Sequence, residues 1–261
     1  MFKLFSKKSK VEKSFEQTPI ADLLKEKYGV KGTIKVDGRN FTFHDARCFY
    51  DTWQEIVHNK MYEFASSSAK PYIIDCGANM GLSVFYFARQ YPGAEIIAFE
   101  PEGAIYDILK KNIETYSLSN VKAYKKAVWE SETTLEFYSD HGMGGSVTNV
   151  FKKQKPVEIE TLRLANFINK KVDMLKLDIE GAEYTVLKDC AHLLNNVENI
   201  FVEYHSFINK EQQLDDLLLL LKARGFRYHL KESFSRKRPF IDRNCACENM
   251  DMAINVFAYR H

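Results

Sequence analysis

The sequence lacks a long apolar run, a charge of one sign and an evenly paired set of cysteines. No segment has enough consecutive apolar residues for a signal peptide or a membrane span. The 37 basic and 35 acidic side chains give a formal charge of +2, so no global field draws the protein to nucleic acid. The five cysteines are irregularly spaced, which is typical of a reduced protein. We therefore expect a cytoplasmic protein without a nucleic-acid partner.

Two local features suggest further partners only weakly. Cys245 and Cys247 lie close together, but a zinc site needs a second such pair or spaced histidines, so we interpret them as loop cysteines. Residues 1–18 are rich in lysine and carry a few apolar side chains. This segment is expected to be a disordered tail, with weak contact to an anionic membrane surface as the alternative.

Residues 19–68 are expected to form a small N-terminal cap of helices and a hairpin. The pattern predicts a short helix over 20–28 and a hairpin that turns at Asp37 and Gly38. Apolar residues then recur at helical spacing from Phe49 to Phe64, before a serine linker.

Residues 69–261 are expected to form one α/β domain. Apolar strands at 72–75, 95–100, 121–128, 172–178 and 199–204 are followed by helical patterns, except after the third. This alternation is typical of an open, mostly parallel sheet with helices on both faces. The last two strand-like runs, 226–232 and 252–259, have no helix between them, so the final strand is predicted to be antiparallel.

Polar residues stand at the ends of these strands, where open parallel sheets bind their ligands. Together they indicate a functional site at one rim of the sheet. The candidates are Asp75, Glu100, Lys126 with Ala127, Asp178 with Glu180, and Glu203 with His205.

The turn after the first of these strands contains Gly77, Asn79 and Gly81, and it allows a ligand to approach the backbone. Its glycine spacing is G-x-x-x-G, whereas a dinucleotide site has G-x-G-x-x-G, and Asp75 places negative charge where a pyrophosphate would lie. A cofactor with a positive centre and no phosphate suits these carboxylates. S-adenosylmethionine is such a molecule, with Asp75 near its ammonium and Glu100 on its ribose.

Several segments, in this order and spacing, resemble the FkbM family of S-adenosylmethionine-dependent methyltransferases. They are IIDCGANMGLSVFYFA, IIAFEPE, LKKNI, KKAVWES, VDMLKLDIEGAEYTVLKD and IFVEYH. The resemblance implies a Rossmann-like class I methyltransferase with a seven-stranded sheet whose last strand is antiparallel. It also implies methyl transfer to a hydroxyl, commonly of a sugar in a glycan or glycolipid, or of a natural product. Cofactor contacts are then expected from the strand-end residues, from Pro101 beside Glu100, and from Glu55, which matches an acidic position upstream in the family.

A hydroxyl acceptor must lose a proton as the new bond forms, and four residues are candidates for this chemistry: Asp178, Glu180, Glu203 and His205. We expect His205 to be the base because its ordinary pKa is near neutrality, with Asp178 or Glu203 orienting it. Glu180 is alternatively an acid in the first turn of the following helix, where the helix dipole favours it, and Glu183 is expected to be a solvated helix residue. The same set of side chains could instead hold Mg²⁺.

Two other functions remain open at this point. One is a nicotinamide-dependent oxidoreductase, and the other is a module that binds the cofactor without catalysis. The glycine-rich stretch His141–Ser146 is either a loop that closes over the acceptor or a plain exposed loop. The sequence names neither the acceptor nor the oligomeric state.

Overall fold

The computed structural model describes residues 13–15, 19–139, 145–146, 156–234, 236–241 and 250–260. Cys245, Cys247 and residues 140–144 lie outside the described residues, as does most of the lysine-rich segment. Within that segment, β1 (Lys13–Phe15) pairs with β2 (Gly32–Val36), where the sequence had predicted a disordered tail. In the described part of the chain, no helix is both long and apolar enough to cross a membrane.

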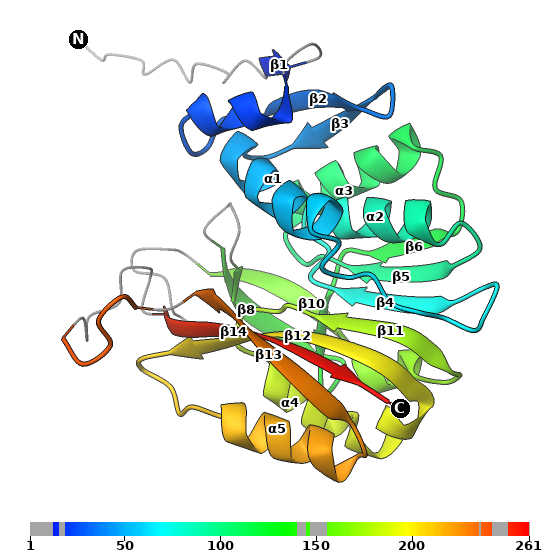
Figure 1. Cartoon of the computed structure of the whole chain (residues 1–261), viewed down its shortest axis with the longest axis vertical. Helices are drawn as coiled ribbons and strands as arrows, with labels where there is room; N and C mark the ends of the chain where they lie inside the picture. The colour runs from blue at the N-terminus through cyan, green and yellow to red at the C-terminus, as the bar shows by residue number, and fades with distance from the viewer. Residues whose placement is uncertain are drawn as a thin grey trace.

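A seven-stranded sheet forms the centre of the molecule (Figure 1). The strand order is β13-β14-β12-β11-β4-β5-β6. Neighbouring strands from β12 to β6 run parallel, whereas β14 is antiparallel to both β12 and β13, which confirms the predicted reversed strand. The strands are β4 (Tyr72–Cys76), β5 (Glu95–Phe99), β6 (Val121–Tyr124), β11 (Val172–Leu177), β12 (Val197–Phe207), β13 (Arg227–Phe234) and β14 (Met250–Tyr259).

Helices cover both faces of this sheet (Figure 1). Helices α2 (Leu82–Gln90) and α3 (Gly103–Thr115) lie on one side, and α4 (Glu183–Asp189) and α5 (Leu214–Ala223) on the other. Because successive strand residues point to opposite faces, Ile73 packs in one core with Phe87 of α2, and Ile74 packs in another with Leu187 of α4. Strands β4 and β11 are buried throughout, which explains their nearly continuous apolar sequences.

The N-terminal cap contains η1 (Ile20–Lys25), the hairpin of β2 and β3 (Arg39–Phe43), α1 (Ala46–Trp53) and η2 (Gln54–His58), a single π-helical turn. Asp37 and Gly38 both have positive φ, as the predicted hairpin turn requires. Phe41 and Phe49 pack in one cluster with Leu82 and Phe85, so the cap shares a core with α2.

Several elements begin or end at residues other than those predicted from the sequence. The helix expected over 49–64 begins at Ala46, where the Asp45 side chain accepts hydrogen bonds from two backbone N–H groups, and ends at His58, before Lys60 takes a φ of 53°. The helix expected over 20–28 is only η1. The helical pattern that follows the strand expected over 172–178 is divided into α4 and η4 (Ala191–Asn196).

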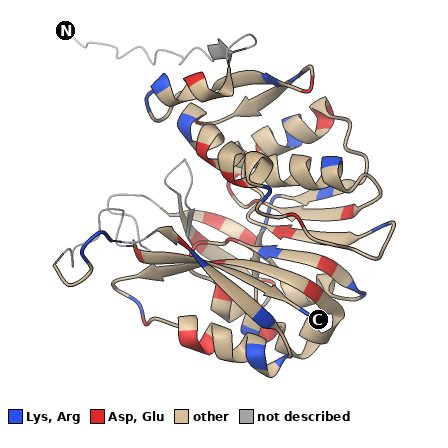
Figure 2. Ribbon diagram, viewed as in Figure 1, with Lys and Arg blue, Asp and Glu red and all other residues tan. Residues whose placement is uncertain are grey.

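A second sheet was not predicted. The strand expected over 121–128 breaks after Tyr124, and its remainder, β7 (Ala127–Trp129), joins a four-stranded sheet. The order in that sheet is β7-β10-β8-β9, with β8 (Thr134–Ser139), β9 (Gly145–Ser146) and β10 (Val157–Arg163), and η3 (Leu164–Phe167) follows β10. Acidic and basic residues are interspersed along the ribbon in Figure 2.

Candidate active site

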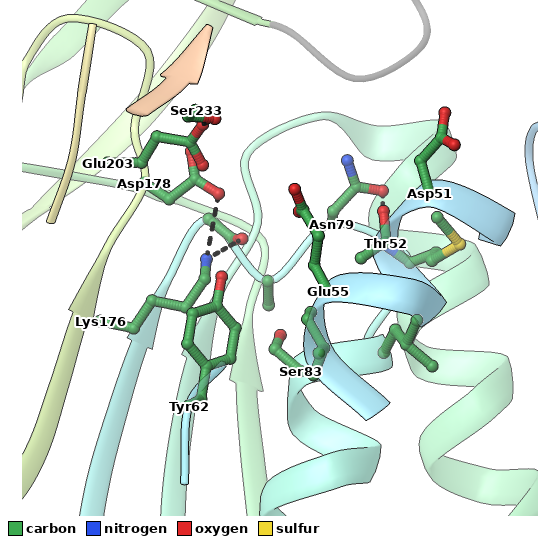
Figure 3. Close-up of a pocket in the computed structure, with 15 residues that line it drawn as sticks. Asp51, Thr52, Glu55, Tyr62, Asn79, Ser83, Lys176, Asp178, Glu203 and Ser233 are labelled. Atoms are coloured by element: carbon green, nitrogen blue, oxygen red, sulfur yellow. Dashed lines mark hydrogen bonds and ion pairs between the residues drawn. The ribbon is translucent and has the colours of Figure 1, made fainter. Parts of the chain in front are cut away.

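A cavity of about 270 Å³ lies at the carboxyl ends of β4, β11 and β12, beneath α1 and η2 (Figure 3). The central sheet, the glycine turn and the N-terminal cap all contribute to its wall. The lining residues are Asp51, Thr52, Glu55, Ile56, Tyr62, Gly77, Ala78, Asn79, Met80, Leu82, Ser83, Lys176, Asp178, Glu203 and Ser233.

Carboxylates dominate the charged groups of this wall. Asp51, Glu55, Asp178 and Glu203 stand against one cation, Lys176. Glu55 comes from the π-helical turn, and its side chain points into the cavity (Figure 3). Burial raises the pKa of Glu55, Lys231 opposes the shift, and Asp178 and Asp51 add to it. Such a wall favours a cationic ligand over a phosphate.

Lys176 is the partner of the buried carboxylate at the end of β4. Asp75 is fully buried and accepts a 2.5 Å hydrogen bond from Ser83 Oγ, and its Oδ1 lies 3.3 Å from Lys176 Nζ. Lys176 Nζ also donates to the Gly77 carbonyl at 2.9 Å and lies 3.4 Å from Asp178. Burial alone would lower the pKa of Lys176, but Asp75 and Asp178 hold it well above its usual range. The cation nearest to Asp75 is therefore part of this chain, and Asp75 does not line the cavity.

The glycine turn is held tightly against the neighbouring strand. Gly77 has a φ of 85°, and a Cβ there would stand 1.9 Å from the Asp178 carbonyl oxygen. Gly81 has a φ of 89°, and a Cβ there would meet Leu109 at 2.6 Å. Asn79 also takes a positive φ, and its side-chain oxygen accepts from the Met80 N–H at 2.6 Å and contacts His44 Nε2 at 2.8 Å. These contacts fix the backbone that forms one side of the cavity.

Glu100 follows β5 and fastens the same turn from the other side. Its two carboxylate oxygens accept hydrogen bonds of 2.9 Å from the N–H groups of Asn79 and Glu102. Burial raises the pKa of Glu100 to about 7, although these two hydrogen bonds act in the opposite direction. Pro101 is the next residue and is half-buried. Glu100 lies beside the turn but is not among the residues that line the cavity.

His205 lies within a group of carboxylates at the end of the sheet. Its Nδ1 is 2.9 Å from Glu183 Oε1, and its Nε2 is 3.6 Å from Glu180 Oε2. The expected orienting residues have other partners, since Asp178 is paired with Lys176 and Glu203 accepts a 2.6 Å hydrogen bond from Ser233. The expectation that Glu183 is solvated is wrong, because its side chain is 1% exposed.

Burial and mutual repulsion change the ionisation of this group. Burial raises the pKa of Glu180 to about 8, with His205 opposing the shift, and burial together with Asp178 raises the pKa of Glu203 to about 7. Burial alone would lower the pKa of His205, but Glu180, Glu183 and Glu203 together raise it well above its usual value.

Two further candidates lie away from the cavity. Lys126 is half-exposed and forms a 2.9 Å ion pair with Glu160 on β10, and Ala127 begins β7 in the second sheet. Neither lines the cavity. Tyr62, by contrast, lines it while its ring packs between Phe87 and Phe201, so it belongs to both the core and the cavity wall.

One group of side chains has the proximity that a metal ion requires. Asp178, Glu203 and His205 each present a ligand atom, and these atoms lie within 4.8 Å of one another. Carboxylate and imidazole ligands suit Mn²⁺, Fe²⁺ or Zn²⁺ better than Mg²⁺, which prefers oxygen ligands alone.

The sheet order, the reversed strand next to the edge and a cavity at the carboxyl ends of β4, β11 and β12 are the arrangement that the resemblance implied for the class I methyltransferase fold. Residues 75–228, more than half of the chain, match the profile of the family described as "Methyltransferase FkbM domain". The chain belongs to this family, as the resemblance had predicted.

Two curated proteins and one solved structure are similar to this chain. Methyltransferase sdnD of Sordaria araneosa is 30% identical over 212 residues, covering 67% of this chain and 80% of that protein. 2-O-methyltransferase NoeI of Sinorhizobium fredii is 22% identical, covering 59% of this chain and 69% of that protein. Methyltransferase FkbM from Methylobacillus flagellatus, a solved structure, is 16% identical with a TM-score of 0.49, covering 74% of this chain and 45% of that one.

Proposed function

We propose that this methyltransferase transfers a methyl group from S-adenosylmethionine to a hydroxyl oxygen, most simply that of a sugar in a glycan or glycolipid. The observation that carries the proposal is the position of His205, which does not itself line the cavity but has a ring nitrogen within 4.8 Å of carboxylate oxygens of Asp178 and Glu203, which do. The name of the relative NoeI, a 2-O-methyltransferase, supports oxygen as the acceptor atom.

The charges in the cavity fit this methyl donor, which carries a sulfonium and an ammonium. Glu55 and Asp178 line the cavity and offer carboxylates to the cations, which is the role first expected of Asp75. The volume of about 270 Å³ is near the lower end of ordinary ligand pockets, so we assign the cavity to the methionine portion. The ribose then extends toward Glu100, whose carboxylate can accept from its hydroxyls.

Both alternative functions lose support. A nicotinamide dinucleotide would bring its pyrophosphate to a wall with four carboxylates and one lysine already paired twice, and membership of a methyltransferase family also argues against it. A binding module without catalysis would not need the buried ionisable group around His205, because burying such groups is costly.

When bound, S-adenosylmethionine supplies an electrophilic methyl group on a positively charged sulfur. Glu55 and Asp178 would hold its cations, and the methyl group would pass to the acceptor oxygen with the C–S electron pair left on sulfur. Neutral His205 takes the hydroxyl proton on Nε2, because Nδ1 faces Glu183. The walls of the cavity hold the three reacting atoms in line, and such positioning contributes much of the rate enhancement.

A divalent cation is the second candidate for activating the hydroxyl. The ligand atoms of Asp178, Glu203 and His205 support this alternative, since a bound cation lowers the pKa of a coordinated hydroxyl. Dialysis against a chelator followed by a transfer assay separates the two mechanisms. Full activity without metal favours His205 as the base, and loss of activity that Mn²⁺ or Mg²⁺ restores favours the cation.

The function is tested with methyl-labelled S-adenosylmethionine and a panel of glycosides and glycolipids with free hydroxyls. We expect label in a new O-methyl ether, identified by mass and NMR, and little transfer by a His205→Gln variant. Label on nitrogen or carbon would contradict hydroxyl methylation. Donor binding without transfer to any member of the panel would favour the binding module.

A further inference from the structure

Glu183 is a buried carboxylate that neither lines the cavity nor belongs to the group of possible metal ligands. Its side chain is 1% exposed, at the first residue of α4. One of its oxygens contacts His205 Nδ1 at 2.9 Å. A buried carboxylate costs free energy unless its acceptor sites are filled, so its other contacts need to be accounted for.

The remaining contacts of Glu183 are to the loop between β11 and α4. Both of its oxygens accept from the Gly181 N–H at 3.0 Å, and Oε1 also accepts from the Ile179 N–H at 3.3 Å. This loop has unusual backbone angles, with a φ of 56° at Glu180 and 93° at Gly181. The hydrogen bonds that the loop N–H groups donate to Glu183 stabilise the backbone at these angles and hold the loop that carries Asp178 and Glu180.

One carboxylate thus joins two separate parts of the candidate active site. The loop after β11 supplies Asp178 and Glu180, and β12 supplies Glu203 and His205. Glu183 contacts the loop backbone and the His205 ring together, so it fixes the ring relative to the loop. Because Glu183 faces Nδ1, the neutral imidazole carries its hydrogen on Nδ1 and has its lone pair on Nε2, which lies 3.6 Å from Glu180.

We propose that Glu183 is the positioning residue of the methyl-transfer site, holding the His205 ring through Nδ1 and fixing the Asp178–Glu183 loop, which places Glu180 3.6 Å from Nε2. This inference rests on the proposed function, in which His205 accepts the hydroxyl proton.

The charges around His205 come from each element packed against it. Glu180 and Glu183 face it from the loop and the start of α4, Glu203 lies on its own strand, and Asp178 ends the neighbouring one. Lys210, in the turn after β12, interacts electrostatically with Glu183. Among these, Glu183 is the one in hydrogen-bond contact with the ring, so its neutralisation should have a larger effect than that of more distant acids.

The direct test is NMR of the histidine ring nitrogens in the full chain across a pH titration, with the His205 signal assigned from a His205→Gln variant. In Glu183→Gln we expect the His205 midpoint to fall by about 1 to 2 pH units, because an opposite charge in contact raises a histidine pKa by such amounts. The matched control is Glu198→Gln, a partly exposed position near the other end of β12, which should leave the midpoint unchanged. An unchanged midpoint in Glu183→Gln would overturn the inference.

A second variant keeps the inference testable if Glu183→Gln does not fold. Glu183→Asp retains the charge but shortens the side chain, so the contact with Nδ1 is lost. The His205 midpoint should then lie between those of the wild type and Glu183→Gln. If Glu183→Gln does not fold, an aspartate variant with a wild-type midpoint would refute the assignment.

The kinetic measurements use as substrate the glycoside that accepts the labelled methyl group in the assay described above. In Glu183→Gln, kcat should fall at least ten-fold, KM for S-adenosylmethionine should stay within about two-fold, and the midpoint of the pH–rate profile should fall with that of His205. Wild-type kcat with an unmoved profile would refute the inference while leaving the proposed function intact. Failure of the proposed function appears elsewhere, as a wild-type protein that transfers no methyl group.

Discussion

Removal of the Lys176 ammonium should destabilise the protein more than most substitutions would. Lys176→Met keeps the length of the side chain and leaves the fully buried Asp75 without its cation, and the bond to the Gly77 carbonyl is also lost. Removing one partner of a buried ion pair typically costs about 3 to 5 kcal/mol of unfolding free energy. For a chain of this size, that corresponds to a decrease in Tm of about 6 to 20 °C.

The double variant Asp75→Asn, Lys176→Met gives the decisive comparison. With the carboxylate neutralised, no buried charge is stranded, and Asp178 is exposed enough to reach solvent. The double variant should therefore lose less free energy than the sum of the single variants, with a coupling of about 1 to 3 kcal/mol in urea unfolding. Strictly additive losses would refute the argument that Asp75 is neutralised by Lys176.

The sign of the pH dependence follows from the raised pKa of Lys176. The stabilisation from this ion pair is fully present below the ordinary lysine pKa of about 10.4, and it is lost as the pH rises through the higher folded-state value. The wild-type protein should thus keep this contribution through neutral and mildly alkaline pH. The difference in unfolding free energy between wild type and the double variant should accordingly be constant from about pH 6 to 9.

Three further predictions concern the candidate active site. Gly77→Ala should reduce affinity for S-adenosylhomocysteine by at least ten-fold in calorimetry, because its Cβ would stand 1.9 Å from the Asp178 oxygen, and unchanged affinity would contradict the tight turn. Affinity for the same ligand should fall as the pH drops through about 7, where Glu100 takes up a proton, and Glu100→Gln should remove that dependence. The rate of methyl transfer should rise with pH through a midpoint above 6.5, because His205 must lose its proton to act as a base, and a rate that falls over that range would exclude this role.

Much of the main sheet is predictable from sequence because its signals are local. Buried parallel strands such as β4 and β11 appear as short apolar runs, and the missing helix before residues 252–259 indicates the reversed strand. The second sheet is not predictable in this way. Its strand β7 is continuous in pattern with β6, and β10 pairs with β7 and β8, which only the folded chain brings together.

The residues at the rim of the candidate site are predictable from the sequence, whereas two buried residues next to them were not predicted. Carboxylates at strand ends indicate the rim, and Glu55 was expected from the family resemblance. Lys176 was missed, although a lysine inside an otherwise apolar strand is itself a sign of a buried partner. Glu183 was missed because its spacing also fits the solvated side of a helix, and only the positive φ values at Glu180 and Gly181 bring its carboxylate back onto the loop.

The central claim is that the carboxylate-lined cavity and Glu100 bind S-adenosylmethionine. The most direct test is calorimetric titration of the wild-type protein, of the double variant Glu55→Gln, Glu100→Gln, and of Glu114→Gln, a matched control at an exposed position on α3. We predict one site of micromolar affinity in the wild type and the control, weakened at least ten-fold in the double variant. Equal affinity in all three proteins, or no binding to the wild type, would contradict the account.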